Sequence, residues 1–299
     1  MHRFFPKILL PLILLLSPSA MLPAQAAAKH PSPQPQATQP QTAAPLPDVP
    51  TLLHQVEIAR QHNATMMENY CFDATTTSRD SSGKTEVKVT EITYVNGVRL
   101  EKLLSKNGVP LPPEDEEKET DRVNKAIAKA KSRVAAAQAK GEETDSNGDP
   151  LISLDRLLQI FSLYNERREM VNGRSAIAFD FSGNRTVKTK GVTEGVLHSI
   201  SGTVWIDEKD HQIARMMGTV NDGYKVGFGL ILNIAKGSGG LVEFTPVNNE
   251  VWLPSRLDGH GRVRVLLVED ELDGTESTVF SNYQRFGVTT DQTVTLPSQ

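Results

Sequence analysis

The sequence predicts an α+β domain organised around a mainly antiparallel β-sheet. Between Val196 and Phe286 the chain consists of strand-length segments in which apolar and polar residues alternate, and no helical pattern interrupts them. Turn residues such as Asn221-Asp-Gly223 separate these segments. Neighbouring parallel strands need long crossover connections, so strands that follow one another this closely exclude a parallel, doubly wound sheet.

The composition is that of a globular domain and not of a nucleic-acid-binding protein. The chain has 299 residues, of which 38% are hydrophobic, enough for one sizeable core, and its formal net charge is -4. Lysine and arginine are interspersed with aspartate and glutamate and do not form a basic surface that could neutralise phosphates. We therefore expect no nucleic-acid partner.

The first 26 residues have the three parts of a secretory signal peptide. Arg3 and Lys7 form a basic region, residues 8–16 form an apolar core, and Ala24-Gln-Ala26 provides a small-residue cleavage site. The apolar core is shorter than the roughly 20 residues that span a membrane. The sequence thus predicts a cleaved signal and a periplasmic protein that is not integral to the membrane, with an uncleaved anchor as the alternative.

The chain contains one cysteine, Cys71, which lies well past the predicted cleavage site. It therefore cannot carry the lipid of a lipoprotein at that site, and it cannot form a disulfide within the chain. No basic residue flanks Cys71 closely. The sequence favours a small buried side chain over a reactive thiol.

Composition divides the exported chain into a linker, a domain and a tail. Residues 27–50 are rich in Pro, Gln and Ala, which bury too little apolar surface to fold, so they predict a disordered linker. The α+β domain is expected from residue 51 to residue 286. The polar residues 287–299 are expected to form a flexible tail.

The domain begins with a predicted helix, Leu52–Asn69, for which Thr51 is the candidate N-cap. Apolar residues recur at helical spacing on one face, which ends in Met66 and Met67. Such a face is typical of a helix that packs on a core, although methionine also suits an adaptable apolar binding surface.

Strand-like runs follow this helix and resume after residue 160. In the first part of the domain they cover residues 70–79, 85–95, 99–105, 164–170 and 175–181. Asn96-Gly97 and Asn172-Gly173 are dipeptides that two-residue hairpins prefer. A second short helix, Leu154–Phe161, is predicted behind the N-cap candidate Ser153.

The later runs complete the sheet. They cover residues 202–207, 212–217, 224–235, 241–244, 251–254, 262–269 and 275–286. Asp258-Gly-His-Gly261 is interpreted as a turn before the sixth of these runs, and Asp273-Gly274 as the start of the seventh.

A long charged helix from residue 114 to residue 140 interrupts the strands. Acidic residues occupy its first turn and basic residues its C-terminal half, which complements the helix dipole. Its apolar stripe is narrow, so its contact with the domain should be thin. We predict an insertion that lies on the surface, with a mobile lid as the alternative.

No motif predicts catalysis, a cofactor or a metal. His198, His211 and His260 lie in or near Gly or Asp turns without the helical spacing of zinc ligands, and a zinc or general-base site at them is the alternative. Asp145-Ser-Asn-Gly-Asp149 resembles the start of a calcium loop, but its glycine is misplaced and no glutamate completes it, so a turn is predicted. Nucleophile-elbow and phosphate-loop motifs are absent.

Six short motifs resemble those of an uncharacterised family of exported bacterial proteins. They are Asn69-Tyr70, Asn96-Gly97, Leu104–Glu114, Gly202–Asp207, Val251–Pro254 and Tyr283–Phe286. That family is similar to LolA-like outer-membrane lipoprotein carrier and sorting proteins. The resemblance extends over residues 52–286 and implies an open, strongly curved half-barrel sheet around helices, with an apolar cavity for acyl chains or an acylated partner. The charged helix at residues 114–140 departs from these carriers.

The resemblance and the missing catalytic motifs lead to one functional hypothesis. We expect a non-enzymatic periplasmic binding protein that holds a lipid or an acylated polypeptide, with a lipoprotein as the candidate partner. The residues expected to line the cavity are Met66, Met67, Val204, Ile206, Phe244 and Trp252. The same side chains could instead close a dry core. An envelope regulator or scaffold that binds a protein segment is the alternative function, followed by an envelope hydrolase.

Overall fold

The computed structural model describes residues 45–286 apart from 96–97, 142–143, 145–147, 149–151, 228–230 and 266–269. The predicted signal peptide, most of the linker, the Asn96-Gly97 turn, most of the loop at residues 145–149 and the tail lie outside the described residues. In the described part of the chain, no helix combines the length and apolar composition needed to cross a membrane.

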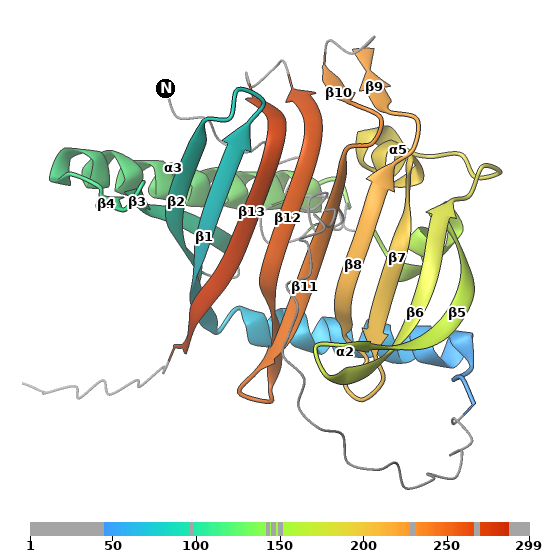
Figure 1. Cartoon of the computed structure of the whole chain (residues 1–299). Coiled ribbons are helices and arrows are strands. Elements are labelled where there is room, and N and C mark those ends of the chain that lie inside the picture. The colour runs from blue at the N-terminus through green and yellow to red at the C-terminus, as the bar shows by residue number, and fades with distance from the viewer. Residues whose placement is uncertain are drawn as a thin grey trace, which may run out of the picture.

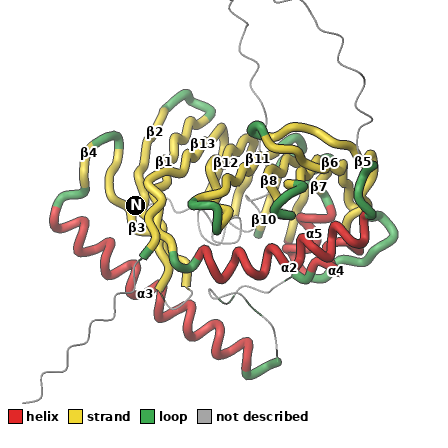
Figure 2. The backbone as a smooth tube through the Cα atoms, turned by 90° about the horizontal axis from the view of Figure 1, so that it is seen from below, coloured by secondary structure: helices red, strands yellow, loops and turns green. Residues whose placement is uncertain are grey.

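The fold class is confirmed: antiparallel strands form a broad, curved, open sheet, and helices pack against it (Figures 1 and 2). The helices are α2 (Val49–Met67), α3 (Pro113–Gln138), α4 (Leu154–Ile160) and α5 (Gly191–His198). Every strand pair that the structure describes is antiparallel.

The strands belong to two hydrogen-bonded sheets. The nine-stranded sheet has the order β4-β3-β2-β1-β13-β12-β10-β9, with β11 also paired to β12, and the four-stranded sheet has the order β5-β6-β7-β8. The first contains β1 (Tyr70–Asp80), β2 (Thr85–Val95), β3 (Val98–Lys106), β4 (Val109–Pro110), β9 (Tyr224–Val226), β10 (Leu232–Ile234), β11 (Gly239–Val247), β12 (Val251–Val265) and β13 (Asp270–Arg285). The second contains β5 (Phe161–Val171), β6 (Arg174–Gly183), β7 (Ile200–Asp207) and β8 (Ile213–Val220).

The two sheets adjoin along β8 and β11, so they continue one another (Figure 1). At one end the N–H of Val220 donates to the carbonyl oxygen of Ser238 at 2.9 Å, and the N–H of Gly237 donates to the carbonyl oxygen of Val220 at 2.9 Å. Further along, an ion pair of 2.5 Å joins Arg215 of β8 to Glu243 of β11.

Helix α2 starts earlier than predicted and has a different cap. Asp48, not Thr51, is the N-cap, and its carboxylate accepts the N–H of Thr51 at 3.0 Å. Pro50 lies in the first turn, where its missing N–H costs nothing. A carboxylate at the N-cap also complements the helix dipole, which is why Asp48 is preferred to the threonine. The end of the predicted linker is therefore helical.

The predicted start of the sheet at Val196 is wrong, because residues 191–198 form helix α5. The apolar residues Val192, Val196 and Leu197 share one side of this helix and pack on the core. The strand begins only at Ile200, after the C-cap Ser199.

Two predicted turns lie inside long strands. Residues 258–261 continue β12, and Asp273-Gly274 continues β13, where Gly261 pairs with Gly274. Both glycines have positive φ values, 119° and 144°, and a Cβ at Gly274 would collide with the carbonyl oxygen of Arg79. Glycine here permits a bend and close strand contact, not a chain reversal. The run at residues 224–235 is also two strands, β9 and β10.

Other local signals are confirmed. Asn172 and Gly173 both have positive φ, 51° and 79°, and link Val171 to Arg174 in the tight hairpin that the dipeptide predicts. Ser153 caps α4 by accepting the N–H of Arg156 at 3.2 Å. The bounds of β2 agree with the prediction, and the charged helix α3 is shifted by only one or two residues at its ends.

Helix α3 covers the outer edge of β3. The carboxylate of Glu119 accepts the N–H of Leu103 at 2.8 Å, and the guanidinium of Arg122 donates to the carbonyl oxygen of Glu101. Arg122 also donates from Nε to Glu119 at 2.8 Å. These two side chains occupy backbone groups that a further strand would otherwise use, so α3 protects this edge from association.

We expect Glu119→Ala to destabilise the domain by about 1–3 kcal/mol, because it leaves the N–H of Leu103 without its acceptor. Urea denaturation gives the free energy of unfolding, and light scattering shows whether the exposed edge causes association. Glu117→Ala, at an exposed position of the same helix, is the matched control. Equal stability of the two variants would show that Glu119 does not support the edge.

Candidate functional site

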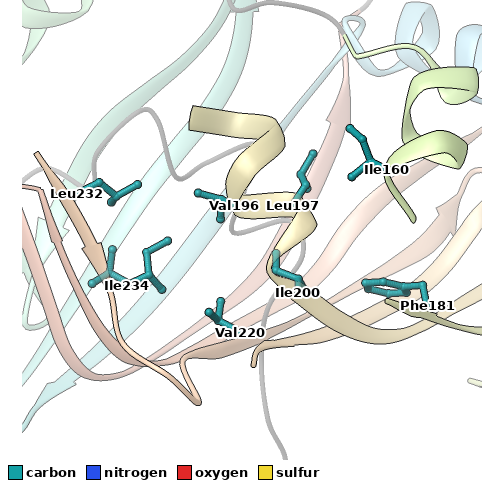
Figure 3. Packing of buried hydrophobic residues seen from close by; sticks show 9 residues of the cluster. Ile160, Phe181, Val196, Leu197, Ile200, Val220, Leu232 and Ile234 are labelled. Carbon is teal, nitrogen blue, oxygen red and sulfur yellow. The ribbon is translucent and has the colours of Figure 1, made fainter. Parts of the chain in front are cut away.

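The side of the sheet that carries α2, α4 and α5, here called the helix-facing side, holds several apolar clusters. One of them gathers around α5 (Figure 3). Val196 and Leu197 of α5 pack with residues from α4 and five strands: Ile160, Phe181, Ile200, Val220, Leu232, Ile234 and Val263. At its margin lie the half-buried side chains of Val204, Met216 and Leu257.

Helix α2 packs on both sheets. Its first half places Leu52 and Val56 against Ile177, Phe179 and Ile206 of the four-stranded sheet. Its C-terminal end places Met66 and Met67 against a cluster of the nine-stranded sheet that contains Tyr70, Phe72, Ala74, Ile92, Val251 and Leu253. The helix therefore ties the two sheets together on one side.

Helix α3 contributes a separate apolar cluster. Val123, Ile127 and Ala130 pack on Val98 and Leu100 of β3. Val98 and Leu100 pair with Val95 and Thr93 of β2, whereas Ile92 of the α2 cluster pairs with Glu101, so the apolar stripe of α3 packs on the opposite face of the sheet from α2.

The six residues expected to line a common cavity fall into different clusters. Met66 and Met67 lie at the end of α2, whereas Val204 and Ile206 lie under its beginning and near α5. Phe244 and Trp252 belong to a further cluster with Trp205. Ile206 and Trp252 are 3% and 6% exposed, so both are packed into the protein. Met66, Met67, Val204 and Phe244 are half-buried. The role of the six residues in ligand binding stays a prediction.

Trp252 is held by polar contacts as well as by packing. Its indole N–H donates to the carboxylate of Asp210 at 3.1 Å, and the guanidinium of Arg174 lies 5.3 Å from the ring centroid. Arg174 in turn donates from Nε and Nη2 to Asp207 at 2.6 and 2.8 Å. These contacts fix the β7–β8 turn against β12.

Burial of Asp207 alone would raise its pKa, but hydrogen bonds outweigh this effect. The donors are the guanidinium of Arg174 and the backbone N–H groups of Asp210 and Lys209, and they lower the pKa of Asp207 below its ordinary value. Similarly, the hydrogen bond from Arg156 lowers the pKa of Glu194. Both carboxylates stay ionised near neutral pH.

The three histidines that were considered as ligands lie on separate elements. His198 ends α5 and its Nε2 is 2.8 Å from the carbonyl oxygen of Asn184, and His211 lies in the β7–β8 turn. His260 lies within β12, not in a turn as expected, and its Nδ1 is 3.0 Å from the carbonyl oxygen of Gly239. Among the described residues, no group of three or more His, Cys, Asp or Glu side chains could hold a metal ion.

Cys71 lies in β1 and is partly buried. Burial and the neighbouring carboxylates of Glu91 and Asp73 raise the pKa of its thiol. A raised pKa lowers the fraction of thiolate, which is the reactive form.

Comparisons with known proteins return matches only among solved structures. No protein-family model and no curated protein matches the chain. The similar structures include a domain assigned to outer membrane lipoprotein sorting from Vibrio parahaemolyticus, with 8% identity, a TM-score of 0.39 and coverage of 80% of this chain and 94% of that one.

Two further structures match over similar lengths. A DUF1329 family protein from Desulfovibrio piger has 11% identity and a TM-score of 0.35, with coverage of 81% of this chain and 94% of that one. A LolA superfamily protein from Nitrosomonas europaea has 7% identity and a TM-score of 0.31, with coverage of 80% and 94%. The matched structures thus include a protein of the LolA group that the sequence motifs resemble. Structural similarity at these TM-scores carries no argument about a ligand.

Two important residues of the helix-facing side were missed from the sequence. Leu257 directly precedes the Asp-Gly-His-Gly segment that resembles a turn, although its alternation with Val263 along one strand face could have shown it. Asn63 lies on α2, where the sequence predicts only apolar packing. Its side chain donates to the carbonyl oxygen of Trp252 at 2.9 Å and accepts the N–H of Trp252 at 2.6 Å.

Proposed function

We propose that this protein is a non-enzymatic binding protein of the periplasm that holds a lipid or an acylated polypeptide on the helix-facing side of its sheet. The observation that carries the proposal is the arrangement of apolar residues there. The clusters there are closed by α2, α4 and α5, and half-buried aliphatic side chains such as Leu257 and Val204 lie at their margins. Partly covered apolar surface of this kind favours an apolar ligand.

Two buried carboxylates, Asp207 and Glu194, are in a state that suits a structural role and not that of a general acid. A general acid near neutral pH needs a raised pKa, which burial without a partner provides. The pKa values of Asp207 and Glu194 are instead lowered by arginine partners, so neither group holds a proton to donate. The periplasmic location rests on the predicted signal peptide at residues 1–26.

Lipid retention tests the proposal directly. Burial of an acyl chain contributes about 0.8 kcal/mol per methylene before ordering costs, so a bound lipid should survive purification. Native mass spectrometry of protein purified without detergent should show an added mass that organic extraction removes. Apo protein that also fails to bind a fluorescent fatty acid would contradict the proposal and leave the fold unaffected.

We expect Leu257→Asp to weaken lipid binding at least tenfold, about 1.4 kcal/mol, because it places a charge at the margin of the apolar cluster. Val279→Asp is the matched control. Leu257 pairs with Thr278, and Val279 pairs with Arg256, so the two aliphatic residues of β12 and β13 point to opposite faces. Val279 is 53% exposed. Equal loss of binding in both variants would place the ligand elsewhere.

An alternative partner is an extended protein segment that adds to β5. This strand pairs only with β6 in the described structure, and it exposes Tyr164 (51%) and Met170 (66%). Unlike β3, it has no helix of the described residues over its outer edge in Figure 1, so its backbone groups there could bind another strand. Protection of β5 amides from hydrogen exchange by a stoichiometric partner would favour this role over lipid binding.

A further inference from the structure

The helix-facing side changes from apolar to polar along the strands of the nine-stranded sheet. In register, Ala74 of β1 lies beside Phe280 of β13, in the apolar cluster that contains Phe72 and Ile92. Two residues further along β1, Thr76 lies beside Thr278. Because every second residue of a strand points to the same face, this change occurs on the side that carries α2.

The first polar row, here called the lysine row, contains Lys106, Lys88, Thr76 and Thr278 on four neighbouring strands. Lys88 and Lys106 lie directly opposite each other on β2 and β3. Two like charges in such a pair repel each other, and the nearby carboxylate of Glu86 offsets this repulsion. The row ends at Leu257 of β12, which pairs with Thr278 and belongs to the margin of the α5 cluster.

The second polar row, here called the carboxylate row, follows two residues further on. Ser78 of β1 pairs with Glu86 of β2 and with Glu276 of β13, and its hydroxyl donates to Glu276 at 2.9 Å. The row nearest the apolar clusters therefore carries basic side chains, and the row beyond it carries acidic ones. The two rows are about 7 Å apart, the length of two residues along a strand.

An ion pair joins the lysine row to the carboxylate row. Lys88 lies 2.6 Å from Glu86, with the two side chains 27% and 41% exposed. Exposed pairs of this kind contribute little to stability. A ligand with a negative and a positive group could replace this ion pair at small cost, because its negative group would pair with Lys88 and its positive group with Glu86.

We propose that the two rows form the head-group site of a zwitterionic phospholipid, and this proposal rests on the proposed function. The phosphate lies at Lys88 and Lys106, and the ammonium group lies at Glu86 and Glu276. The acyl chains then run from Thr278 past Leu257 toward the α5 cluster, where the test of the proposed function also places them. The order of the rows orients the lipid.

Three lipids with the same acyl chains test the proposal on the full exported chain: dioleoylphosphatidylethanolamine, dioleoylphosphatidylglycerol and dioleoylglycerol. We expect Lys88→Gln/Lys106→Gln to weaken binding of both phospholipids at least tenfold and to leave dioleoylglycerol within twofold, because that lipid has no phosphate. Glu86→Gln/Glu276→Gln should weaken phosphatidylethanolamine alone. Lys84→Gln/Lys102→Gln, which changes two lysines outside the row, is the charge-matched control.

The outcomes separate the head-group site from the proposed function. If the lysine variants bind all three lipids in the same ratio as the parent, the head-group site is wrong while lipid binding stands. If the parent binds none of the lipids, both fail. Release of bound phosphatidylethanolamine by millimolar inorganic phosphate would assign the lysine row to a free anion and overturn the proposal. Unchanged melting temperatures of the variants confirm that the fold is intact.

Discussion

Replacing Arg174 by methionine is expected to lower the free energy of unfolding by about 3–5 kcal/mol, because it leaves the buried carboxylate of Asp207 without its charged partner. Methionine retains the length and apolar part of the arginine side chain. What is lost is the two hydrogen bonds to Asp207, the ion pair of 2.7 Å to Asp210 and the contact with the ring of Trp252.

Urea denaturation followed by tryptophan fluorescence measures this effect. Both tryptophans of the chain, Trp205 and Trp252, lie in one cluster, so the signal reports on the region around the substitution. Lys209→Met, at an exposed position of the same turn, controls for the loss of a positive charge. A loss below about 1 kcal/mol for Arg174→Met would show that the ion pair contributes no more than a surface pair.

The same ion pair predicts a pH dependence. The pKa of Asp207 is lowered in the folded protein, so its stabilisation is complete above the ordinary pKa of about 4 and is lost as the pH falls through the lower folded value. The stability of the parent should therefore fall more steeply below pH 5 than that of Arg174→Met. Parallel curves for the two proteins would contradict the role assigned to Arg174.

Elements with strong local signals could be predicted from the sequence. The Asn172-Gly173 hairpin requires positive φ at two adjacent residues, and few dipeptides other than Asn-Gly supply it. The cap at Ser153 and the bounds of β2 also follow from neighbouring residues. The long helix α3 was found because its charge distribution and its apolar stripe both have helical order.

Elements that depend on distant partners could not be predicted. Asp-Gly pairs at residues 258–259 and 273–274 usually indicate a chain reversal, yet here they lie on adjacent long strands in which Gly261 meets Gly274. Nothing near either pair in sequence shows that the other lies opposite. The contacts of the candidate cavity residues depend on distant partners in the same way, since the indole ring of Trp252 meets Asp210 and Arg174, which come much earlier in the chain.

Asn63 shows most clearly how a distant contact determines the fold. The pairs between β12 and β13 begin only at Arg256, which pairs with Val279. Before that point Trp252 has no β13 residue in register, and the amide of Asn63 takes the place of a strand by pairing with both its N–H and its carbonyl oxygen. One side chain of α2 thereby satisfies two backbone groups that are 189 residues away in sequence.

Asn63→Leu is accordingly expected to destabilise the protein by about 2–4 kcal/mol, since leucine has a similar shape but leaves the N–H and the carbonyl oxygen of Trp252 unpaired at the helix–sheet contact. Urea denaturation gives the free energy of unfolding. Asn63→Asp should lie between leucine and the parent, because a carboxylate still accepts the N–H but cannot donate to the carbonyl oxygen. His62→Leu, at the adjacent exposed position, should change stability by less than about 0.5 kcal/mol. If Asn63→Leu were as stable as the parent, water would have to satisfy both backbone groups, and α2 would be held on the nine-stranded sheet by the packing of Met66 and Met67 alone.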